Sequence, residues 1–259
     1  MVARDIRTSL HGRTLGLTDR HHLVVDGRIA HLNPFYQDQI VFMDDFLGDA
    51  IDSRYNFQEG TDSATSDFAI LADEIGGAAR LTTGDSATTT MAGNGVQVDL
   101  GELNFKAANG GLSFETRLKC DAILHLSLFI GFTDQVSALE APWTLTTATY
   151  TSNQSDGCGF LFDNAATTDT IRCVGVKANT DASNVDTADA WAAATYKKFR
   201  IDVGSDEVAR FYIDEALVAT IASALTKTVG LSPVITAFSE SAASILIDID
   251  YLRVTMDRV

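Results

Sequence analysis

The sequence predicts an all-β protein, an antiparallel β-sandwich preceded by an extended N-terminal arm. Apolar and polar residues alternate with period two in many short runs, and turn signals rich in Gly, Asn and Asp separate these runs at close intervals. Helical periodicity is scarce, which excludes alternating β-α-β units. The chain has 259 residues, 46% of them hydrophobic, enough to bury a core without disulfides or a structural metal.

Residues 1–38 form the predicted arm, and its charge differs from that of the rest of the chain. Up to His31 it carries five arginines against three aspartates, whereas the remainder carries 14 basic and 32 acidic residues. Large apolar residues are few before Leu23, so the segment alone cannot offset its ordering entropy. We expect it to bind a partner, with a frayed tail as the alternative. The basic residues that would make this contact are Arg4, Arg7, Arg13, Arg20 and Arg28.

A small hairpin is predicted within this arm. Asp26-Gly27 stands between the apolar runs 23–25 and 28–30, and Asp-Gly is a strong two-residue turn signal. Pro34 marks a linker, and a new strand is expected over 40–46. We therefore place the sandwich domain at residues 39–259.

Two runs in the body show the alternation most clearly. In 112–120 the residues Leu112, Phe114 and Leu118 share one face, and in 124–132 five apolar residues do so. The other face of the second run holds His125, Ser127, Phe129 and Gly131, so we expect this face to be partly covered and the strand to be central. Further strands are expected at 78–83, 96–100, 158–162, 170–177, 197–203, 208–214, 216–221, 232–238 and 244–255. One helical turn is expected at 186–194, and surface loops at 60–66, 84–90 and 143–155.

Cysteine and histidine patterns indicate no metal site. Cys120, Cys158 and Cys173 match no zinc spacing, and we expect small buried hydrophobes in a protein that folds in a reducing cytosol. His125 is expected in mid-strand as a packed or hydrogen-bonded group. The other four histidines lie in the arm without ligand spacing: His11, His21, His22 and His31.

The body resembles a known fold family in three places. Trp191 and Tyr196-Lys197-Lys198-Phe199-Arg200-Ile201-Asp202-Val203 lead into Val208–Asp214 and Ala216–Ile221, which resembles the strand–turn–strand signature of concanavalin-A-like, laminin-G-like jelly rolls. Glu215 stands where that pattern has a turn glycine. The opening 43–49 and the closing run 245–254 resemble the first and last strands of such modules. The resemblance spans about residues 40–259 and implies a jelly-roll sandwich.

A jelly roll behind a short arm is similar to bacteriophage virion proteins, and most of all to capsid decoration or cement proteins. This resemblance implies a non-enzymatic structural protein located in the virion, whose arm binds the major capsid protein. A homo-oligomer is expected, and a trimer is our guess because closed cyclic assembly lets weak arms act together. No cofactor is implied. The net charge of −16 disfavours a nucleic acid partner, and no apolar stretch or secretory signal points to a membrane.

A carbohydrate-binding module of a tail fibre, or a lectin, is the alternative. Trp143, after Pro142, is the candidate sugar platform. Four residues near the strand 158–162 could hold a calcium ion, although acidic residues are common in turns anyway: Asp156, Asp163, Asn164 and Asp169.

A glucanase-like enzyme is the third hypothesis, because many concanavalin-like folds are glycoside hydrolases. Those families carry an E-x-D-x-x-E or E-x-D-x-E pattern on one strand, and the sequence contains neither. Asp248 and Asp250 share one strand face, but their neighbours on that face are Leu246 and Leu252. We interpret the two aspartates as solvated or paired with Lys or Arg.

Overall fold

The computed structural model describes residues 39–62, 64–146, 149–164, 166 and 169–258, and the backbone of four short strands before them. The chain divides into two compact units, Met1–Ile40 and Val41–Asp257. No helix in the described residues is long and apolar enough to cross a membrane.

The N-terminal unit is a four-stranded antiparallel sheet of β1 (Ile6–Leu10), β2 (Arg13–Leu17), β3 (Leu23–Val25) and β4 (Arg28–Ala30), in that order. Val25 pairs with Arg28, which confirms the predicted hairpin between them. The pairing of β1 with β2 was not predicted. The side chains of the five arm arginines lie outside the described residues, and the binding of a partner stays a prediction.

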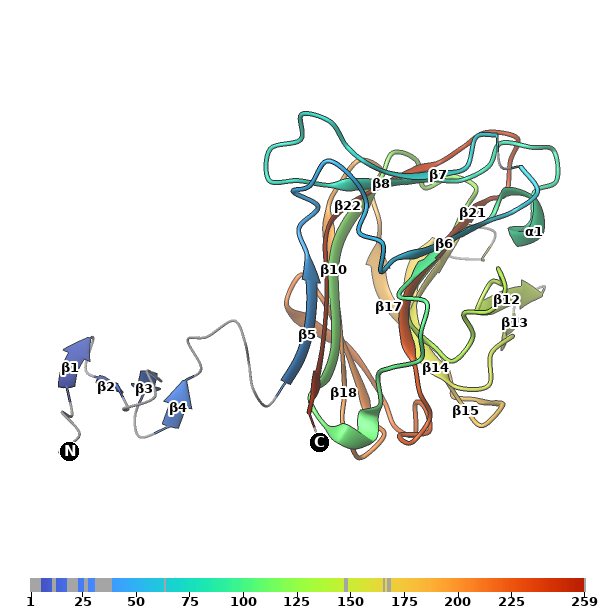
Figure 1. Cartoon of the computed structure of the whole chain (residues 1–259). Coiled ribbons are helices and arrows are strands. Elements are labelled where there is room, and N and C mark those ends of the chain that lie inside the picture. The colour runs from blue at the N-terminus through green and yellow to red at the C-terminus, as the bar shows by residue number, and fades with distance from the viewer. Residues whose placement is uncertain are drawn as a thin grey trace. The chain divides into compact units, whose positions relative to one another are not determined.

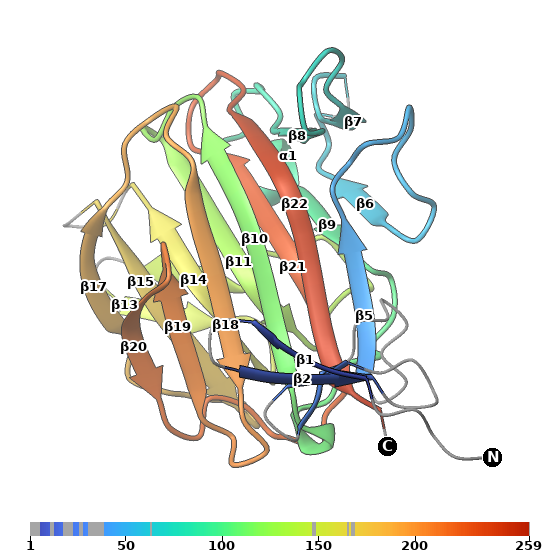
Figure 2. The ribbon, with the colours of Figure 1, turned by 90° about the vertical axis from the view of Figure 1, so that its left-hand side faces the viewer.

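The second unit is a sandwich of two large sheets, as predicted (Figure 1). In the first sheet the strands lie in the order β20 (Ala216–Ile221), β19 (Ala209–Ile213), β18 (Lys197–Val203), β10 (Leu112–Cys120), β22 (Leu246–Asp257), β8 (Ala79–Thr82) and β7 (Asp67–Ile70). β5 (Gln39–Asp44) pairs with β22 beside this path. Figure 2 shows β10 and β22 running side by side near the middle of this sheet.

In the second sheet the strands lie in the order β16 (Thr180–Asp181), β15 (Thr170–Lys177), β14 (Gly157–Asp163), β11 (Leu126–Thr133), β21 (Ser232–Ser239), β9 (Val96–Asp99) and β6 (Asn56–Glu59). β17 (Val185–Ala190) pairs with β15 beside this path. A hairpin of β12 (Trp143–Thr146) and β13 (Thr149–Ser152) stands apart from both sheets. Two short helices, α1 (Met91–Asn94) and the 3-10 helix η1 (Ala107–Asn109), complete the described elements.

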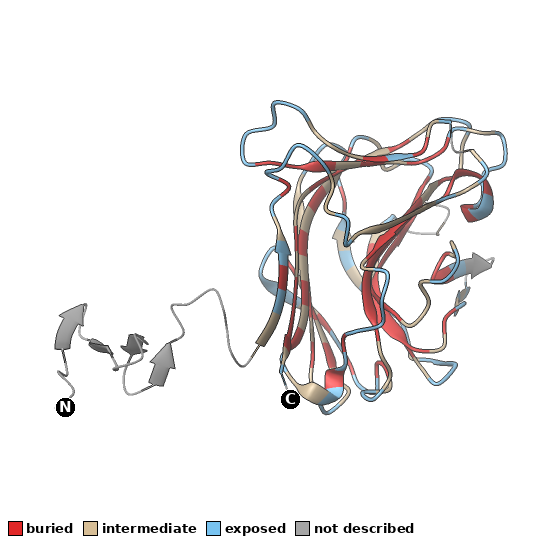
Figure 3. Ribbon diagram, viewed as in Figure 1, coloured by how far each residue is buried: buried red, intermediate tan, exposed pale blue. Residues whose placement is uncertain are grey.

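Aromatic side chains from the facing sheets form the centre of the core. The ring of Phe160 on β14 lies 5.0 Å from that of Phe199 on β18 and 5.3 Å from that of Phe211 on β19. Phe132 on β11 and Phe114 on β10 lie 5.8 Å apart. Buried residues therefore follow the inner faces of both sheets (Figure 3). The apolar residues of the alternating pattern that predicted the strands are those that point into this core.

The outer face of the second sheet is buried as well. Phe129 and Leu161 point away from the first sheet, opposite to Phe132 and Phe160, yet they are 2% and 3% exposed. Residues 134–146 and 149–156, which include β12 and β13, lie over this face, and we call them the cover. The Trp143 ring stacks on Phe129 at 5.1 Å, and Gln58 Nε2 donates to the Val136 carbonyl at 2.7 Å. The predicted surface loop at 143–155 is thus a third layer of the domain.

Other local predictions had mixed outcomes. A strand lies in every predicted strand range of the body. The helical turn expected at 186–194 is wrong, because residues 185–190 form β17 on an edge. His125 is exposed before β11 with a φ of 64°, so its predicted mid-strand position is also wrong. The three cysteines are free and buried as expected, and burial raises the pKa of Cys158 to about 12.

The turn that lacks its glycine is still tight. Ile213 pairs with Ala216, so Asp214 and Glu215 form a two-residue turn, and both have positive φ values, 48° and 69°. Lys198 supports this turn, since its backbone N–H donates to Asp214 at 3.0 Å and its ammonium group binds Glu215 at 2.5 Å. These contacts hold a conformation that glycine would adopt without strain.

Candidate functional site

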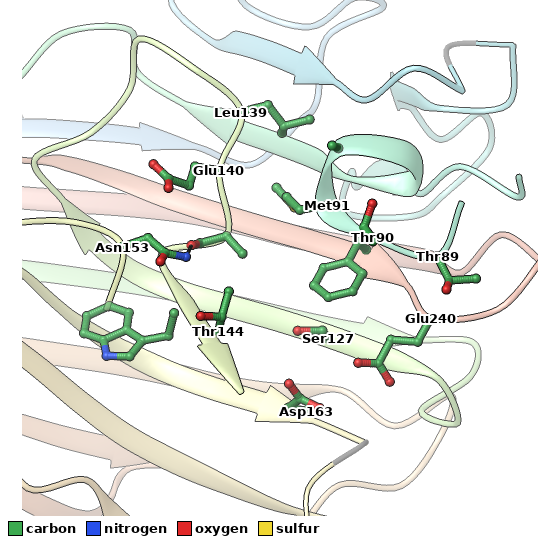
Figure 4. A pocket seen from close by; sticks show the side chains of 14 residues that line it. Thr89, Thr90, Met91, Ser127, Leu139, Glu140, Thr144, Asn153, Asp163 and Glu240 are labelled. Atoms are coloured by element: carbon green, nitrogen blue, oxygen red, sulfur yellow. Dashed lines mark hydrogen bonds between the residues drawn. The ribbon is translucent and has the colours of Figure 1, made fainter. Parts of the chain in front are cut away.

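A pocket of about 480 Å³ opens where the cover leaves the outer face of the second sheet uncovered. Its floor comes from three neighbouring strands: Asp163 ends β14, Ser127 on β11 pairs with it, and Phe238 on β21 pairs with Ser127. Glu240 is the residue directly after β21, two positions beyond Phe238, and therefore on the same side as Phe238. Figure 4 shows the side chains of Asp163 and Glu240 pointing into one space from these strand ends.

The backbone around Glu240 is held from two sides. The Glu240 N–H donates to the His125 carbonyl at 2.7 Å. The fully buried side chain of Asn94, at the end of α1, donates to the carbonyls of Ser239 and Ser241 at 3.2 and 3.1 Å. Glu240 is thereby fixed between α1 and β11, although it lies beyond the end of its strand.

Burial raises the pKa of Glu240 to about 7, and the negative charge of Asp163 contributes to this shift. A carboxyl group with such a pKa is partly protonated at neutral pH and can donate a proton. Asp163 is 6% exposed. Two carboxyl groups thus share a partly apolar pocket, and one of them holds its proton unusually well, which is typical of acid–base sites.

The rest of the lining combines apolar surface with uncharged polar groups. Met91, Leu139, Trp143 and Phe238 supply the apolar part. Hydroxyl and amide groups come from Ser127, Thr89, Thr90, Thr144 and Asn153, and Glu140 adds a third carboxyl group. Such a mixture suits a ligand with apolar ring faces and many hydroxyl groups.

Trp143, the predicted sugar platform, forms part of this lining. It is 4% exposed, and one face of its ring is stacked on Phe129 at an interplanar angle of 28°. The binding of a sugar by Trp143 stays a prediction, and the sugar would have to contact this side chain from inside the pocket.

The four candidate calcium residues do not converge. Asp156 precedes β14 and accepts a hydrogen bond from the Thr226 N–H at 2.6 Å, whereas Asp163 ends the same strand. Asn164 donates to Asp169 at 3.0 Å and accepts from the His125 N–H at 2.8 Å. Among the described residues no group of three or more His, Cys, Asp or Glu side chains could hold a metal ion.

Asp248 and Asp250 lie on the outer face of the other sheet, away from the pocket. Arg80 donates two hydrogen bonds of 2.7 and 3.1 Å to the Asp248 carboxylate, and Arg117 donates one of 2.6 Å to Asp250. The interpretation of these aspartates as partners of Lys or Arg is confirmed.

Glu240 was not among the residues that the sequence singled out, and Asp163 was expected only as a candidate calcium ligand in a turn. The sequence did contain one indication of this site. Residues 157–162 of β14 form a run without polar side chains, and every residue of β14 is buried. A strand buried on both faces needs a layer on each side. The end of such a strand lies beside the edge of its second layer, where a pocket can form.

Comparisons with known proteins place the fold. No known family model and no curated protein matches the sequence. A Bacillus licheniformis beta-glucanase structure is similar with a TM-score of 0.52 and 13% identity, over 83% of this chain and 97% of that one. The structure of LamAcat from Zobellia galactanivorans has a TM-score of 0.57 and 9% identity, over 82% and 96%. SCLam, a non-specific endo-beta-1,3(4)-glucanase from family GH16, has a TM-score of 0.55 and 13% identity, over 85% and 92%.

These matches confirm the jelly-roll fold and correct the expected function. The interpretation as a non-enzymatic capsid decoration protein is wrong, because the similar structures are glycoside hydrolases that share the fold along nearly their whole length. They do not favour the lectin-like alternative either. At 9–13% identity the similarity establishes the fold alone, so the reaction has to be argued from the side chains of this chain.

Proposed function

We propose that the protein is a glycoside hydrolase, with Glu240 as the general acid and Asp163 as the second carboxylate. The observation that carries this proposal is the presence of both side chains in one pocket of uncharged polar and apolar groups. Hydrolysis of a glycosidic bond needs two such groups, one protonated and one ionised. The raised pKa of Glu240 suits the first role.

In the proposed reaction Glu240 donates its proton to the glycosidic oxygen while the bond from that oxygen to the anomeric carbon breaks. Asp163 stabilises the positive charge that develops on the sugar ring. The distance between the Glu240 and Asp163 carboxyl groups when a sugar is bound decides the role of Asp163. Asp163 either attacks the anomeric carbon or deprotonates a water that attacks it. If Asp163 attacks, a water later breaks the bond between Asp163 and the anomeric carbon, and Glu240 regains its proton from that water. If Asp163 instead deprotonates the water, Asp163 passes that proton to solvent and Glu240 regains one from solvent. Both routes consume one water and leave a hydroxyl group on the anomeric carbon.

The test is hydrolysis of a panel of neutral glucan oligosaccharides, followed by mass spectrometry. Laminaritriose and laminaritetraose are suitable members, because they are bound in a similar structure from Z. galactanivorans. We expect cleavage by the natural chain, and a loss of at least about 100-fold in rate for Glu240→Gln and for Asp163→Asn, the usual effect of removing a general acid or base.

Asp250→Asn is the matched control, because it removes a carboxylate from the outer face of the other sheet. We expect it to retain the rate of the natural chain within about two-fold, since a partly exposed ion pair contributes little. Circular dichroism checks that each variant is folded. Absence of cleavage across the panel, or a Glu240→Gln variant as fast as the natural chain, would contradict the proposal.

A further inference from the structure

We propose that the pocket receives the end of an uncharged saccharide chain, so that the enzyme releases short products from chain ends and does not cut within a chain. This inference rests on the proposed hydrolase function and concerns the substrate of the same site. Three features of the pocket carry it: a wall made by the cover, a second wall made by α1, and the absence of positive charge from the lining.

The cover closes the pocket along the strand direction. The floor row of Phe238, Ser127 and Asp163 lines the pocket. The next row on the same face is Thr236, Phe129 and Leu161, all at most 3% exposed. Trp143 stands at this boundary with its ring on Phe129. A saccharide on the floor row therefore cannot continue over the sheet in this direction.

α1 closes the pocket across the strands, on the side of β9. Met91 of α1 lines the pocket and is 8% exposed. It packs on Gly95, where an added Cβ would lie 2.6 Å from Met91 Sδ. Asn94 binds α1 to the carbonyls of Ser239 and Ser241, beyond the end of β21. A chain lying across β14, β11 and β21 therefore meets a fixed wall after β21.

These two walls turn the outer face into a pocket of about 480 Å³. That volume is in the range of sites for small ligands, and an internal segment of a polymer would need an exit at both ends. A chain that enters along the strands ends at the cover, and one that enters across them from β14 ends at α1. The two walls thus favour the terminal part of a saccharide.

The charge of the lining selects an uncharged sugar. In the described part of the chain, the 14 residues that line the pocket include Glu140, Asp163 and Glu240 but no Lys, Arg or His. Carboxylate or sulfate groups on a sugar would be repelled by these residues and would find no cation there. The hydroxyl groups of an uncharged sugar can exchange hydrogen bonds with the side chains of Ser127, Thr144 and Asn153, which line the pocket (Figure 4).

The decisive experiment compares a linear neutral β-glucan oligosaccharide with a cyclic one of the same linkages, because a cyclic chain has no end. We expect the linear substrate to be cleaved faster by at least about 100-fold, since the walls exclude the cyclic one sterically. The first products from an end-labelled linear hexasaccharide should be short fragments from one end only. An oligosaccharide of uronic acids should not be cleaved.

The possible failures can be told apart. Cleavage of the cyclic chain at a comparable rate, or early products of intermediate length, would overturn chain-end recognition and leave the hydrolase proposal intact. If nothing is cleaved, binding of both glucans to the Glu240→Gln variant is measured by calorimetry. Binding of the linear chain alone would then support chain-end recognition and reject hydrolysis, whereas equal binding or no binding would reject chain-end recognition.

A variant of the cover gives a second measurement. Replacing residues 143–152 with a short Gly-Ser connection removes both strands of the hairpin, including the Trp143 ring on Phe129, and opens the wall. We expect this variant to gain cleavage of the cyclic glucan. A folded variant with the selectivity of the natural chain would contradict the role of the cover. The comparison of linear and cyclic substrates on the natural chain stands even if this variant does not fold.

Discussion

Glu240 shows how one residue can combine a role in catalysis with a cost in stability. Its carboxyl group is partly buried and lies near the charge of Asp163, so its ionised form is disfavoured in the folded chain. The unfolded chain has no such environment, and there the pKa returns to the ordinary value of 4.5. Folding therefore favours the protonated form, which is the form that a general acid needs.

The first prediction concerns the pH dependence of this cost. The folded pKa of about 7 lies above the unfolded value, so the contribution of Glu240 to stability is fully present below about pH 4.5 and is lost as the pH rises through 7. The melting temperature of the natural chain relative to Glu240→Gln should therefore fall between pH 5 and pH 8. Differential scanning calorimetry at both pH values measures it.

Asp163→Asn provides the control for that measurement. This change removes the negative charge that helps to raise the pKa of Glu240. The fall in stability between pH 5 and pH 8 should become smaller. An unchanged fall in the Asp163→Asn chain would mean that burial alone shifts the pKa.

The helix α1 has only four residues, but Asn94 at its end fixes the end of β21. Asn94 at its end has no exposed surface, and its amide makes four hydrogen bonds, to the Ser86 N–H and to the carbonyls of Ser86, Ser239 and Ser241. One side chain thus links the loop before α1, the helix itself and the end of β21. Two of these bonds flank Glu240, so the element also positions the proposed acid.

The second prediction is that Asn94→Ala destabilises the protein by about 3 kcal/mol, because it leaves several buried backbone groups without partners. Urea unfolding followed by fluorescence measures this change. At urea concentrations where the variant is still folded, its kcat should also be lower, because the backbone on both sides of Glu240 loses its hydrogen bonds to Asn94. Asn104→Ala, at an exposed position, is the control and should change stability by less than about 0.5 kcal/mol. A similar small change for Asn94→Ala would show that the anchor is dispensable.

At the scale of the whole molecule, the chain joins an acidic sandwich to a basic N-terminal unit. The sandwich contains its own core and both of its large sheets, and contacts cluster separately within residues 1–40. The formation of the sandwich therefore needs none of the first 38 residues. The binding of a partner by the arm, the trimer and the virion location remain predictions.

The third prediction follows from this division. Deletion of residues 1–38 should leave a folded sandwich whose melting temperature is within about 2 °C of that of the full chain, because the sandwich contains its own core and both large sheets. Calorimetry measures the melting temperature, and light scattering measures the mass of both chains. If the arm joins copies, the shortened chain should be monomeric where the full chain is not. Unfolding of the shortened chain would show that the unit boundary is misplaced.

The sequence by itself determined the sandwich, because period-two alternation is a local property that records which side of a strand meets the core. It also determined the Val25–Arg28 hairpin and the burial of the three cysteines. β6, β7, β12 and β13 were not foreseen, whereas β8 and β9, which also have four residues, were. A strand of four residues holds at most two periods of the alternation, so its detection from sequence is uneven.

Only the tertiary structure decided the site. Asp163 and Glu240 are 77 positions apart and come together because β14 and β21 both pair with β11. No local pattern specifies which strands become neighbours across such a separation. The cover likewise acquires its role only when Trp143 stacks on Phe129, because the local sequence does not show which segment covers that face. Pairing over long range created the pocket, and the same burial raised the pKa of the carboxyl group that the proposed reaction needs.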